Sequence, residues 1–489
     1  MRLLALLIAA ASLHAQAKSE WAYIGTDHRL HYKTDQRGNR IMDFSAAGYR
    51  AGGIALPTVA AAKRLTPVAG DNTAAIQAAL DEAKGAVVLA PGDYEIAGTL
   101  AITRSGVVLR GEKGAALRLT GKPHRLLDIH GAGTWRIEGT PTAILDDYVP
   151  SGADSFRVRD AAGFHAGDRV LVQRPVTPEW IHFMGMDTLV RDGKQQTWIH
   201  AGNVIRTDRE IKSVNGDRIT LDVPLSDSLD AKFTAATLVR YSFPGRITEV
   251  GIESLKIATP FDDTPITDAQ FTAFRIDAAE DAWARDIEVH ETQNGITIGP
   301  AAKRVTLTNV RIQHSAAHSG SAAPADFALQ GTQILLDRCA VTGAEGTWPV
   351  VTQAQVTGPI VILNFTADHR GVAPHQRWAT GILVDGGKFP GSAERTPAVS
   401  FSNRAIMGSG HGWDAGWAVA WNVTSPFLTV QQPPGVMNWC IGCTGKPVTP
   451  NTGPNGIFES LNKPVEPASL YLEQLRERLG SAALANIGY

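Results

Sequence analysis

A short pattern of alternating apolar residues recurs between residues 247 and 430, and it constrains the fold more than any other feature of the chain. Its clearest copies are VTLTNVRI (305–312), ILLDRCAV (334–341), IVILNFTA (360–367) and VSFSNRAI (399–406). Each copy has the two-residue period of a β-strand and not the period of a helix. Repeats of roughly 20–50 residues with variable insertions are typical of solenoids. The pattern therefore predicts an all-β fold of stacked coils, a parallel β-helix.

Each copy also carries a polar residue at one fixed place, where the coil has to turn. Asn tolerates the left-handed backbone of a sharp turn and can hydrogen-bond through its amide. We therefore expect turns, and a ladder of stacked Asn side chains, at the aligned residues Ser254, Asp286, Asn309, Arg338, Asn364, Asn403 and Asn422. An antiparallel sandwich is the alternative, although the region has few two-residue hairpin signals.

The same alignment predicts which side chains point inward. One continuous core should contain Val305, Leu307, Val310, Ile312, Ile334, Leu336, Cys339, Ile360, Ile362 and Phe365. Residues 42–57, which are rich in Gly and aromatic residues, are expected to cap the open end of the solenoid.

The N-terminus is typical of a secretory signal. Arg2 precedes an apolar stretch that is too short to span a bilayer, and Ala15-Gln16-Ala17 matches a cleavage site. We expect the mature protein to be secreted or periplasmic. The net charge of −2 gives no basic excess for binding nucleic acid, and no second long apolar run predicts a membrane partner. A monomer is expected.

Three motifs near the N-terminus carry a family resemblance. They are GDNTAAIQAALDEA (70–83), VVLAPGDYEIAGTL (87–100) and SGVVLRGE (105–112). Together they resemble the N-terminal cap and first coils of the pectate-lyase/polygalacturonase superfamily. The resemblance implies a right-handed parallel β-helix of the pectin-lyase type. It implies no single reaction, because the superfamily includes lyases, hydrolases, epimerases and phage spikes.

Residues 155–240 interrupt the coil pattern. Asn215-Gly216 is a hairpin signal between two alternating strands, so we expect a small antiparallel β-domain inserted between early coils. Trp180 and Trp198, on its long loop, either wall a substrate groove or pack the insertion against the solenoid. The predicted organisation is a signal peptide (1–17), a cap with the first coils (18–154), the insertion (155–240), the main coils with active-site loops (241–445), and a C-terminal tail with a helix (446–489).

The sequence indicates no cofactor. Cys440 and Cys443 lack the context of a redox motif and the further ligands of a zinc site, so we expect an inert or disulfide-bonded structural pair. No compact set of carboxylates indicates calcium.

Polar residues that do not fit the coil pattern gather between residues 314 and 439, interleaved with Trp. Since equivalent places on successive coils become neighbours, we expect one cleft. The predicted catalytic residues are His375, Arg377, His369, Arg370, His411 and His314. The predicted substrate-binding residues are Trp378, Trp413, Trp417, Asp326, Gln330 and Asp414.

These residue types favour β-elimination from an acidic polysaccharide that contains uronic acid. Arg can neutralise the carboxylate of the sugar, and His suits proton transfer. A glycoside hydrolase with paired carboxyl groups is the alternative. SGHGWDAG (409–416) resembles the Gly-His-Gly stretch of polygalacturonases, but their other motifs are missing. A third possibility is a carbohydrate-binding protein without catalysis.

Overall fold

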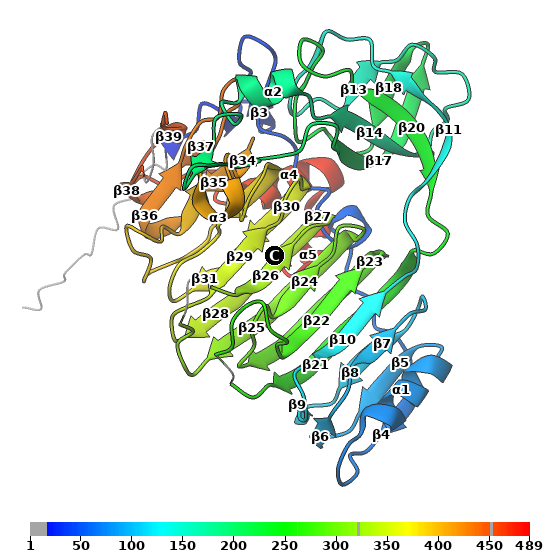
Figure 1. Ribbon diagram of the computed structural model, residues 1–489. Helices are drawn as coiled ribbons and strands as arrows, with labels where there is room; N and C mark the ends of the chain where they lie inside the picture. Colours follow the sequence, from blue (N-terminus) through cyan, green and yellow to red (C-terminus); the bar gives the residue numbers. More distant parts are fainter. Residues whose placement is uncertain (1–16, 262, 320–322, 450–452) are drawn as a thin grey trace, which may run out of the picture.

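The computed structural model describes residues 17–261, 263–319, 323–449 and 453–489. Most of the chain winds into a right-handed parallel β-helix, which confirms the predicted fold class (Figure 1). Each coil passes through three parallel sheets, A, B and C, and then returns to sheet A one coil further on. The predicted signal peptide lies outside the described residues except for Ala17. No helix within the described ranges is long and apolar enough to cross a membrane.

Sheet A holds β4 (Ala61–Leu65), β5 (Ala86–Leu89), β8 (Val108–Gly111), β21 (Ile247–Ala258), β23 (Ala279–His290), β25 (Lys303–His314), β27 (Thr332–Asp337), β30 (Thr357–Leu363), β32 (Ala379–Asp385), β35 (Val419–Trp421), β37 (Trp439–Ile441) and β39 (Ile457–Glu459). The later halves of β21, β23 and β25 continue into sheet B, together with β6 (Gly92–Ile96), β9 (Ala115–Leu119), β28 (Ala340–Gly343) and β31 (Thr366–Ala367). Sheet C holds β7 (Leu100–Ile102), β10 (Arg125–His130), β22 (Thr272–Asp277), β24 (Ile296–Ile298), β26 (Ala325–Leu329) and β29 (Trp348–Thr352), and continues through β33 (Val399–Phe401), β36 (Thr424–Val430) and β38 (Thr444–Pro447).

Shorter elements complete the chain. The paired strands are β1 (Ala17–Lys18) with β40 (Val465–Glu466), β2 (Ala22–Ile24) with β3 (Leu30–Tyr32), β12 (Tyr148–Val149) with β19 (Leu229–Asp230), β15 (Val190–Arg191) with β16 (Lys194–Gln195), and β34 (Ala415–Gly416) with β32. The short helices are η1 (Tyr49–Ala51), α2 (Pro178–Phe183) and α3 (Met407–Gly410).

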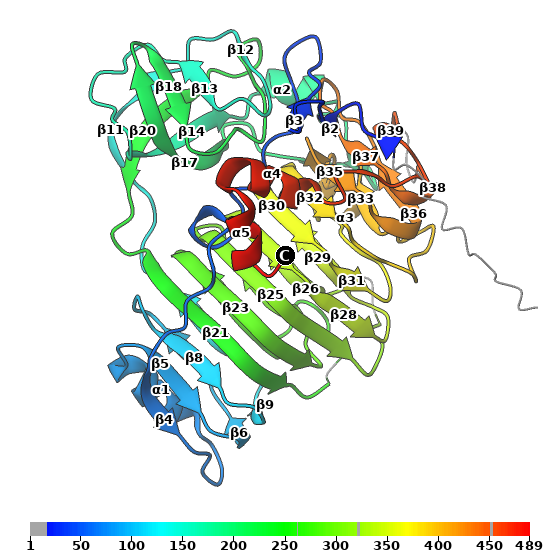
Figure 2. The ribbon, with the colours of Figure 1, turned by 180° about the vertical axis from the view of Figure 1, so that it is seen from behind.

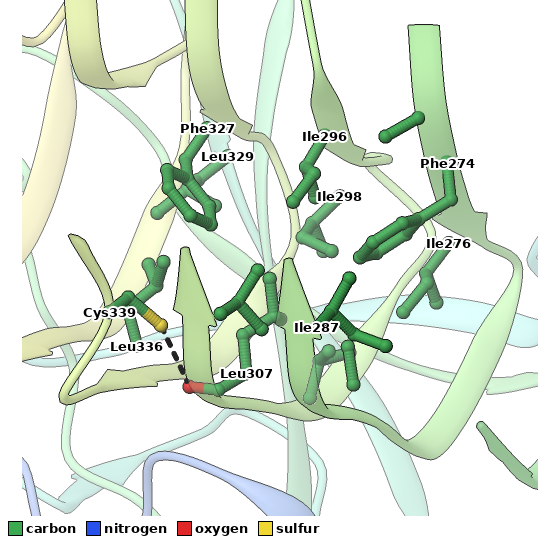
Figure 3. Packing of buried hydrophobic residues seen from close by; sticks show 14 of the residues in the cluster. Phe274, Ile276, Ile287, Ile296, Ile298, Leu307, Phe327, Leu329, Leu336 and Cys339 are labelled. Atoms are coloured by element: carbon green, nitrogen blue, oxygen red, sulfur yellow. Dashed lines mark hydrogen bonds between the residues drawn. The ribbon is translucent and has the colours of Figure 1, made fainter. Parts of the chain in front are cut away.

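The core inside the coils is continuous, as predicted. Every residue of the predicted inward set belongs to one buried cluster that runs through the solenoid. Figure 3 shows part of it, where Phe274 and Ile276 of sheet C face Ile287 and Leu307 across the coil. Burial of such apolar side chains is the main favourable term in folding. All three cysteines are buried and free, so the expected pair is present as thiols.

The predicted turns between sheets A and B are present at six of the seven aligned residues. Ser254, Asp286, Asn309, Arg338, Asn364 and Asn422 all have φ between 50° and 55°. The prediction of such a turn at Asn403 was wrong, because the preceding strand β33 belongs to sheet C. The equivalent turn residue in that coil is Gly386, with φ 67°. No continuous Asn ladder forms, since Asn364 donates to Tyr489 and Asn422 to the carbonyl of Val465.

The inserted domain is an antiparallel sheet of six strands: β11 (Arg136–Ala143), β20 (Thr237–Ser242), β14 (Arg169–Pro175), β17 (Val204–Asn215), β18 (Arg218–Leu221) and β13 (Ser155–Arg157). The hairpin predicted at Asn215-Gly216 joins β17 to β18, with Gly216 at φ 61°. The predicted start at residue 155 is too late, because β11 already pairs with β20. A register shift between Glu138 and Thr142 disturbs the alternation that would mark this strand in the sequence.

The two ends of the chain cover the outer face of sheet A (Figure 2). Tyr49 packs edge-on against Trp283, and Tyr471 of α4 (Leu470–Leu479) donates to the carbonyl of Ala47. The predicted C-terminal helix is found as α4 and α5 (Ser481–Asn486), separated by Gly480. Residues 42–57 therefore cover a side of the solenoid and do not cap its end. That end carries α1 (Thr73–Glu82), whose Ile76 and Leu80 enter the core.

Ser254→Val should lower the free energy of unfolding by about 1–2 kcal/mol, because a β-branched side chain is disfavoured in left-handed backbone. Ser254 is exposed and has φ 53°. The matched control is Lys256→Val, exposed on the extended part of the same strand, which should be near neutral. Urea unfolding measures both. Equal losses would contradict the left-handed turn.

Candidate functional site

Three of the predicted catalytic residues meet on neighbouring C–A turns, the connections that lead from sheet C to the next strand of sheet A. The rings of His375 and His411 lie 4.8 Å apart, edge to face. Arg377 donates to the carbonyl and the hydroxyl of Ser409 at 3.0 and 2.7 Å. Arg404, which was not predicted, donates to the carbonyl of His375 at 2.5 Å. We call His375, Arg377, Arg404 and His411 the His/Arg cluster.

Both histidines of the cluster are neutral at pH 7. Burial, followed by the charges of Arg404 and Arg377, lowers the pKa of His375 to about 4. Burial and then Arg404 lower the pKa of His411 to about 3. Each imidazole therefore keeps a lone pair that can accept a proton.

The backbone at the cluster is strained. Arg377 and Trp378 are consecutive residues with φ 53° and 70°. Residues other than Gly rarely adopt this left-handed region of backbone conformation. The turn is held by parallel bonds from their amides to the carbonyls of His411 and Trp413, at 3.1 and 3.0 Å. Such strain persists only where the surrounding structure imposes it, and it is common at functional sites.

Asp414 lies beside the cluster but does not face solvent. Its carboxyl is buried and accepts bonds from the amide and the hydroxyl of Ser402, at 2.7 and 2.9 Å. Burial raises the pKa of Asp414 to about 8, so it is mostly protonated at pH 7. The predicted role in binding substrate is not supported, because the side chain is inaccessible.

A groove of about 400 Å³ leads to the cluster, between the inserted domain and the C–A turns. The inserted domain contributes Trp135 and Arg206 to its wall. The coils contribute a set of amide side chains, Gln330, Gln353, Gln355 and Gln376. Arg377 donates to the side-chain oxygen of Gln376, so the groove ends beside the His/Arg cluster. Of the predicted binding residues, Gln330 is the one that the groove includes.

The remaining predicted catalytic residues lie at the opposite edge of sheet C. His369 approaches Glu345 at 3.3 Å, and Arg370 stacks over Trp348 at 4.6 Å. His314 is buried and bonds to Asp326 at 2.9 Å. A single cleft for all candidates was therefore wrong. The cause is geometric. His369 and Arg370 lie on a turn that enters sheet C, and His314 and Asp326 lie on the two strands that flank such a turn, β25 and β26. The cluster lies on turns that leave sheet C.

The buried Asp326 carboxylate holds this second group together. It also accepts a bond from the Thr347 hydroxyl at 2.6 Å. Burial lowers the pKa of His314, but the bond to Asp326 and its charge outweigh burial, and the net shift is upward. His314 and Asp326 thus form a structural pair, with no exposed surface for substrate.

The three predicted tryptophan platforms pack the inserted domain onto the coils. Trp378 and Trp417 donate to the two carboxylate oxygens of Asp227 at 2.8 and 3.1 Å, and Trp413 donates to the carbonyl of Met184. Their exposed fractions are 1%, 2% and 4%, which leaves no ring face for a sugar. Trp180 and Trp198 surround Trp378, so the packing alternative holds for them.

Sequence reasoning missed Arg404, Gln353, Gln376, Trp135 and Arg206. One signal could have indicated part of this set: Gln330, Gln353 and Gln376 recur at the interval of one coil. Within the ranges that the structure describes, no group of three or more His, Cys, Asp or Glu side chains is arranged to hold a metal ion.

Comparison with known proteins finds distant structural similarities and no relative by sequence. No family model matches the sequence, and no curated protein matches it. A solved structure with a similar fold is the tailspike protein gp49 from Pseudomonas phage LKA1, at 12% identity and TM-score 0.39, covering 80% of this chain and 72% of that chain. The tailspike of E. coli bacteriophage HK620 in complex with a pentasaccharide has 9% identity and TM-score 0.41, covering 87% and 61%. The A-module of the mannuronan C-5 epimerase AlgE6 from Azotobacter vinelandii has 11% identity and TM-score 0.35, covering 80% and 95%. These similarities are too distant to support an argument about activity.

Asp414→Asn should reduce the pH dependence of stability. The pKa of this carboxyl is 3.8 when unperturbed and about 8 in the folded protein. Between these values the folded state keeps a proton that the unfolded chain releases, so its contribution to stability falls as pH rises. Urea unfolding measures the free energy of unfolding at about pH 5 and about pH 9. The difference between these two values should be smaller in Asp414→Asn than in the parent. The exposed control Asp217→Asn should leave the difference unchanged, and an unchanged difference in Asp414→Asn would contradict the buried neutral carboxyl.

Proposed function

We propose that this protein is a carbohydrate-active enzyme that cleaves an acidic polysaccharide by β-elimination at the His/Arg cluster. The observation that carries the proposal is the pairing of two neutral imidazoles with two guanidinium groups. Among the described residues, neither Arg377 nor Arg404 forms an ion pair, since Arg377 bonds to Ser409 and Gln376 and Arg404 bonds to a carbonyl. Their charge is available for a carboxylate from the substrate.

The chemistry follows from these residue types. Arg377 and Arg404 neutralise the uronate carboxylate, which makes the proton on the adjacent carbon more acidic. His375 or His411 takes that proton as general base. The C–H electron pair forms the new carbon–carbon double bond, and the electron pair of the C–O bond leaves with the glycosidic oxygen. The imidazolium returns its proton to this oxygen, so the histidine is neutral again at the end of the cycle.

Hydrolysis is the less favoured reaction. It requires two carboxyl groups on either side of the glycosidic bond. Of the described residues that line the groove, only Asp208 is acidic, and it pairs with Lys303 at 2.9 Å and Arg246 at 3.1 Å. Asp326 and Asp414 are fully buried. A binding protein without catalysis is the second candidate, favoured by the amide-lined groove, and turnover distinguishes the two.

The proposal includes the setting of the enzyme. The N-terminal sequence supports export to the periplasm or the medium, where polysaccharides are accessible. The net charge of −2 supports a partner other than nucleic acid. We propose that the protein works as a monomer and that its own side chains, without a cofactor, perform the reaction.

Arg377→Lys should impair turnover although it keeps the charge, because an ammonium cannot reproduce the planar two-pronged contact with a carboxylate. His375→Ala should lower the rate by roughly 10²–10⁴-fold if His375 is the base. The assay follows ultraviolet absorption of the unsaturated product on a panel of acidic polysaccharides. Arg311→Lys, exposed on sheet B, is the control and should retain full activity. Saturated products would contradict elimination and would favour hydrolysis of the glycosidic bond instead.

The pH profile of kcat/KM provides an independent test. A base with a pKa of about 4, as for His375, is neutral above that value and protonated below it. Activity should therefore persist well below pH 6.5, the unperturbed value, and fall as pH approaches 4. Arg404→Met removes a positive charge near His375 and should move the acidic limb of the profile, where activity falls, to higher pH. The exposed control Arg395→Met should not move it. A limb near 6.5 in the parent would contradict a buried histidine base.

A further inference from the structure

We infer that the groove between the inserted domain and the coils binds an extended oligosaccharide segment of the substrate, oriented along the stacking axis of the coils. This inference rests on the proposed function and adds where the chain lies beyond the point of cleavage. It assigns recognition to amide side chains on the coils, and to Trp135 and Arg206 on the inserted domain.

The backbone register places two of the glutamines and a candidate base in one column. The backbone N–H of Gln330 donates to the backbone carbonyl of Ile298, that of Gln353 to the carbonyl of Leu329, and that of His375 to the carbonyl of Thr352. In this parallel register, the N–H of a residue bonds to the carbonyl of the residue just before its equivalent on the preceding coil. Leu329 directly precedes Gln330, and Thr352 directly precedes Gln353. Gln330, Gln353 and His375 therefore occupy the same place on three successive coils. Neighbouring strands lie about 4.8 Å apart, which is close to the length of one sugar residue in an extended polysaccharide. The column therefore presents one side chain to each successive sugar and ends at the His/Arg cluster.

The type of side chain indicates the type of ligand. An amide both donates and accepts hydrogen bonds, which matches the hydroxyl groups of a sugar. Four amides line the groove, and the exposed residue Arg206 lines it as well. The half-buried ring of Trp135 lines the same wall. This combination suits a hydroxyl-rich chain that carries acidic groups at intervals.

The groove also includes a guanidinium that the protein's own contacts hold in place. The Arg246 side chain lines the groove, is 2% exposed, and donates to Asp208 through Nη2 at 3.1 Å and to the Tyr241 hydroxyl through Nη1 at 3.4 Å. This part of the groove therefore keeps its shape without a ligand.

The inserted domain is fixed against the coils, so the groove is preformed. Fully buried Lys303 of the coils reaches Asp208 of β17 at 2.9 Å. Arg209, also fully buried, donates across the interface to the carbonyl of Gly358 at 2.7 Å. Breaking such buried contacts is strongly destabilising, which keeps the two walls of the groove at a set separation. A preformed site loses less conformational entropy when it binds.

The test measures binding separately from cleavage. Oligogalacturonates and oligomannuronates, from disaccharide to hexasaccharide, are titrated by calorimetry into the His375→Ala protein, which cannot use His375 as a base. Affinity should rise with chain length. Gln353→Leu and Trp135→Ala should each weaken hexasaccharide binding by about tenfold or more, and should weaken disaccharide binding much less. Gln313→Leu, exposed on sheet B, is the matched control and should bind like the parent. Unchanged thermal unfolding shows that each variant is folded.

The outcomes separate the two proposals. Hexasaccharide binding that is unchanged in both variants, together with cleavage that depends on Arg377, would overturn the groove assignment and leave the proposed function standing. A length-dependent loss in both variants without any cleavage by the parent would support the groove and overturn the lyase. No binding of any acidic probe would overturn the inference and remove support for an acidic substrate.

Discussion

Parallel hydrogen bonding between equivalent residues of successive coils is the constraint on which the rest of the structure depends. It aligns Val305 with Ile334 and then Ile360, so that apolar side chains stack into one core. It also aligns the left-handed turn residues, because a coil can repeat its path only where the backbone turns in the same way. The same register brings Gln330, Gln353 and His375 into a column. Stability and recognition thus depend on one repeat.

The arrangement of covering segments explains why the site lies at the C–A turns. The outer face of sheet A is occupied by both ends of the chain, with Tyr471 and Tyr49 packed against it. The inserted domain leaves the coils between β10 and β21, which is itself a C–A turn. Its docking through Trp378, Trp417 and Asp227 forms the second wall of the groove. The insertion therefore creates the site and does not merely interrupt the solenoid.

The sequence predicted the features that repeat and missed those that depend on a single turn. Alternation identified the core, and Asn309 and Asn364 marked left-handed turns. Alternation could not tell sheet A from sheet C, which is why Asn403 was assigned to the wrong edge. The same ambiguity grouped His314 and His369 with His375. In each coil, however, the turn that enters sheet C and the turn that leaves it are separated by the length of a sheet C strand. The burial of Trp378 and Trp413 depends on contacts with the inserted domain, more than a hundred residues away in the chain, and no local pattern reports such contacts.

Elimination at the His/Arg cluster is the central claim, and the fate of water tests it most directly. An acidic polysaccharide that the protein degrades is digested in water labelled with heavy oxygen, and the products are analysed by mass spectrometry. Elimination breaks the glycosidic bond without adding water, so the new chain ends should carry a double bond and no label. Products that gain one labelled oxygen for each bond broken would show hydrolysis and contradict the account.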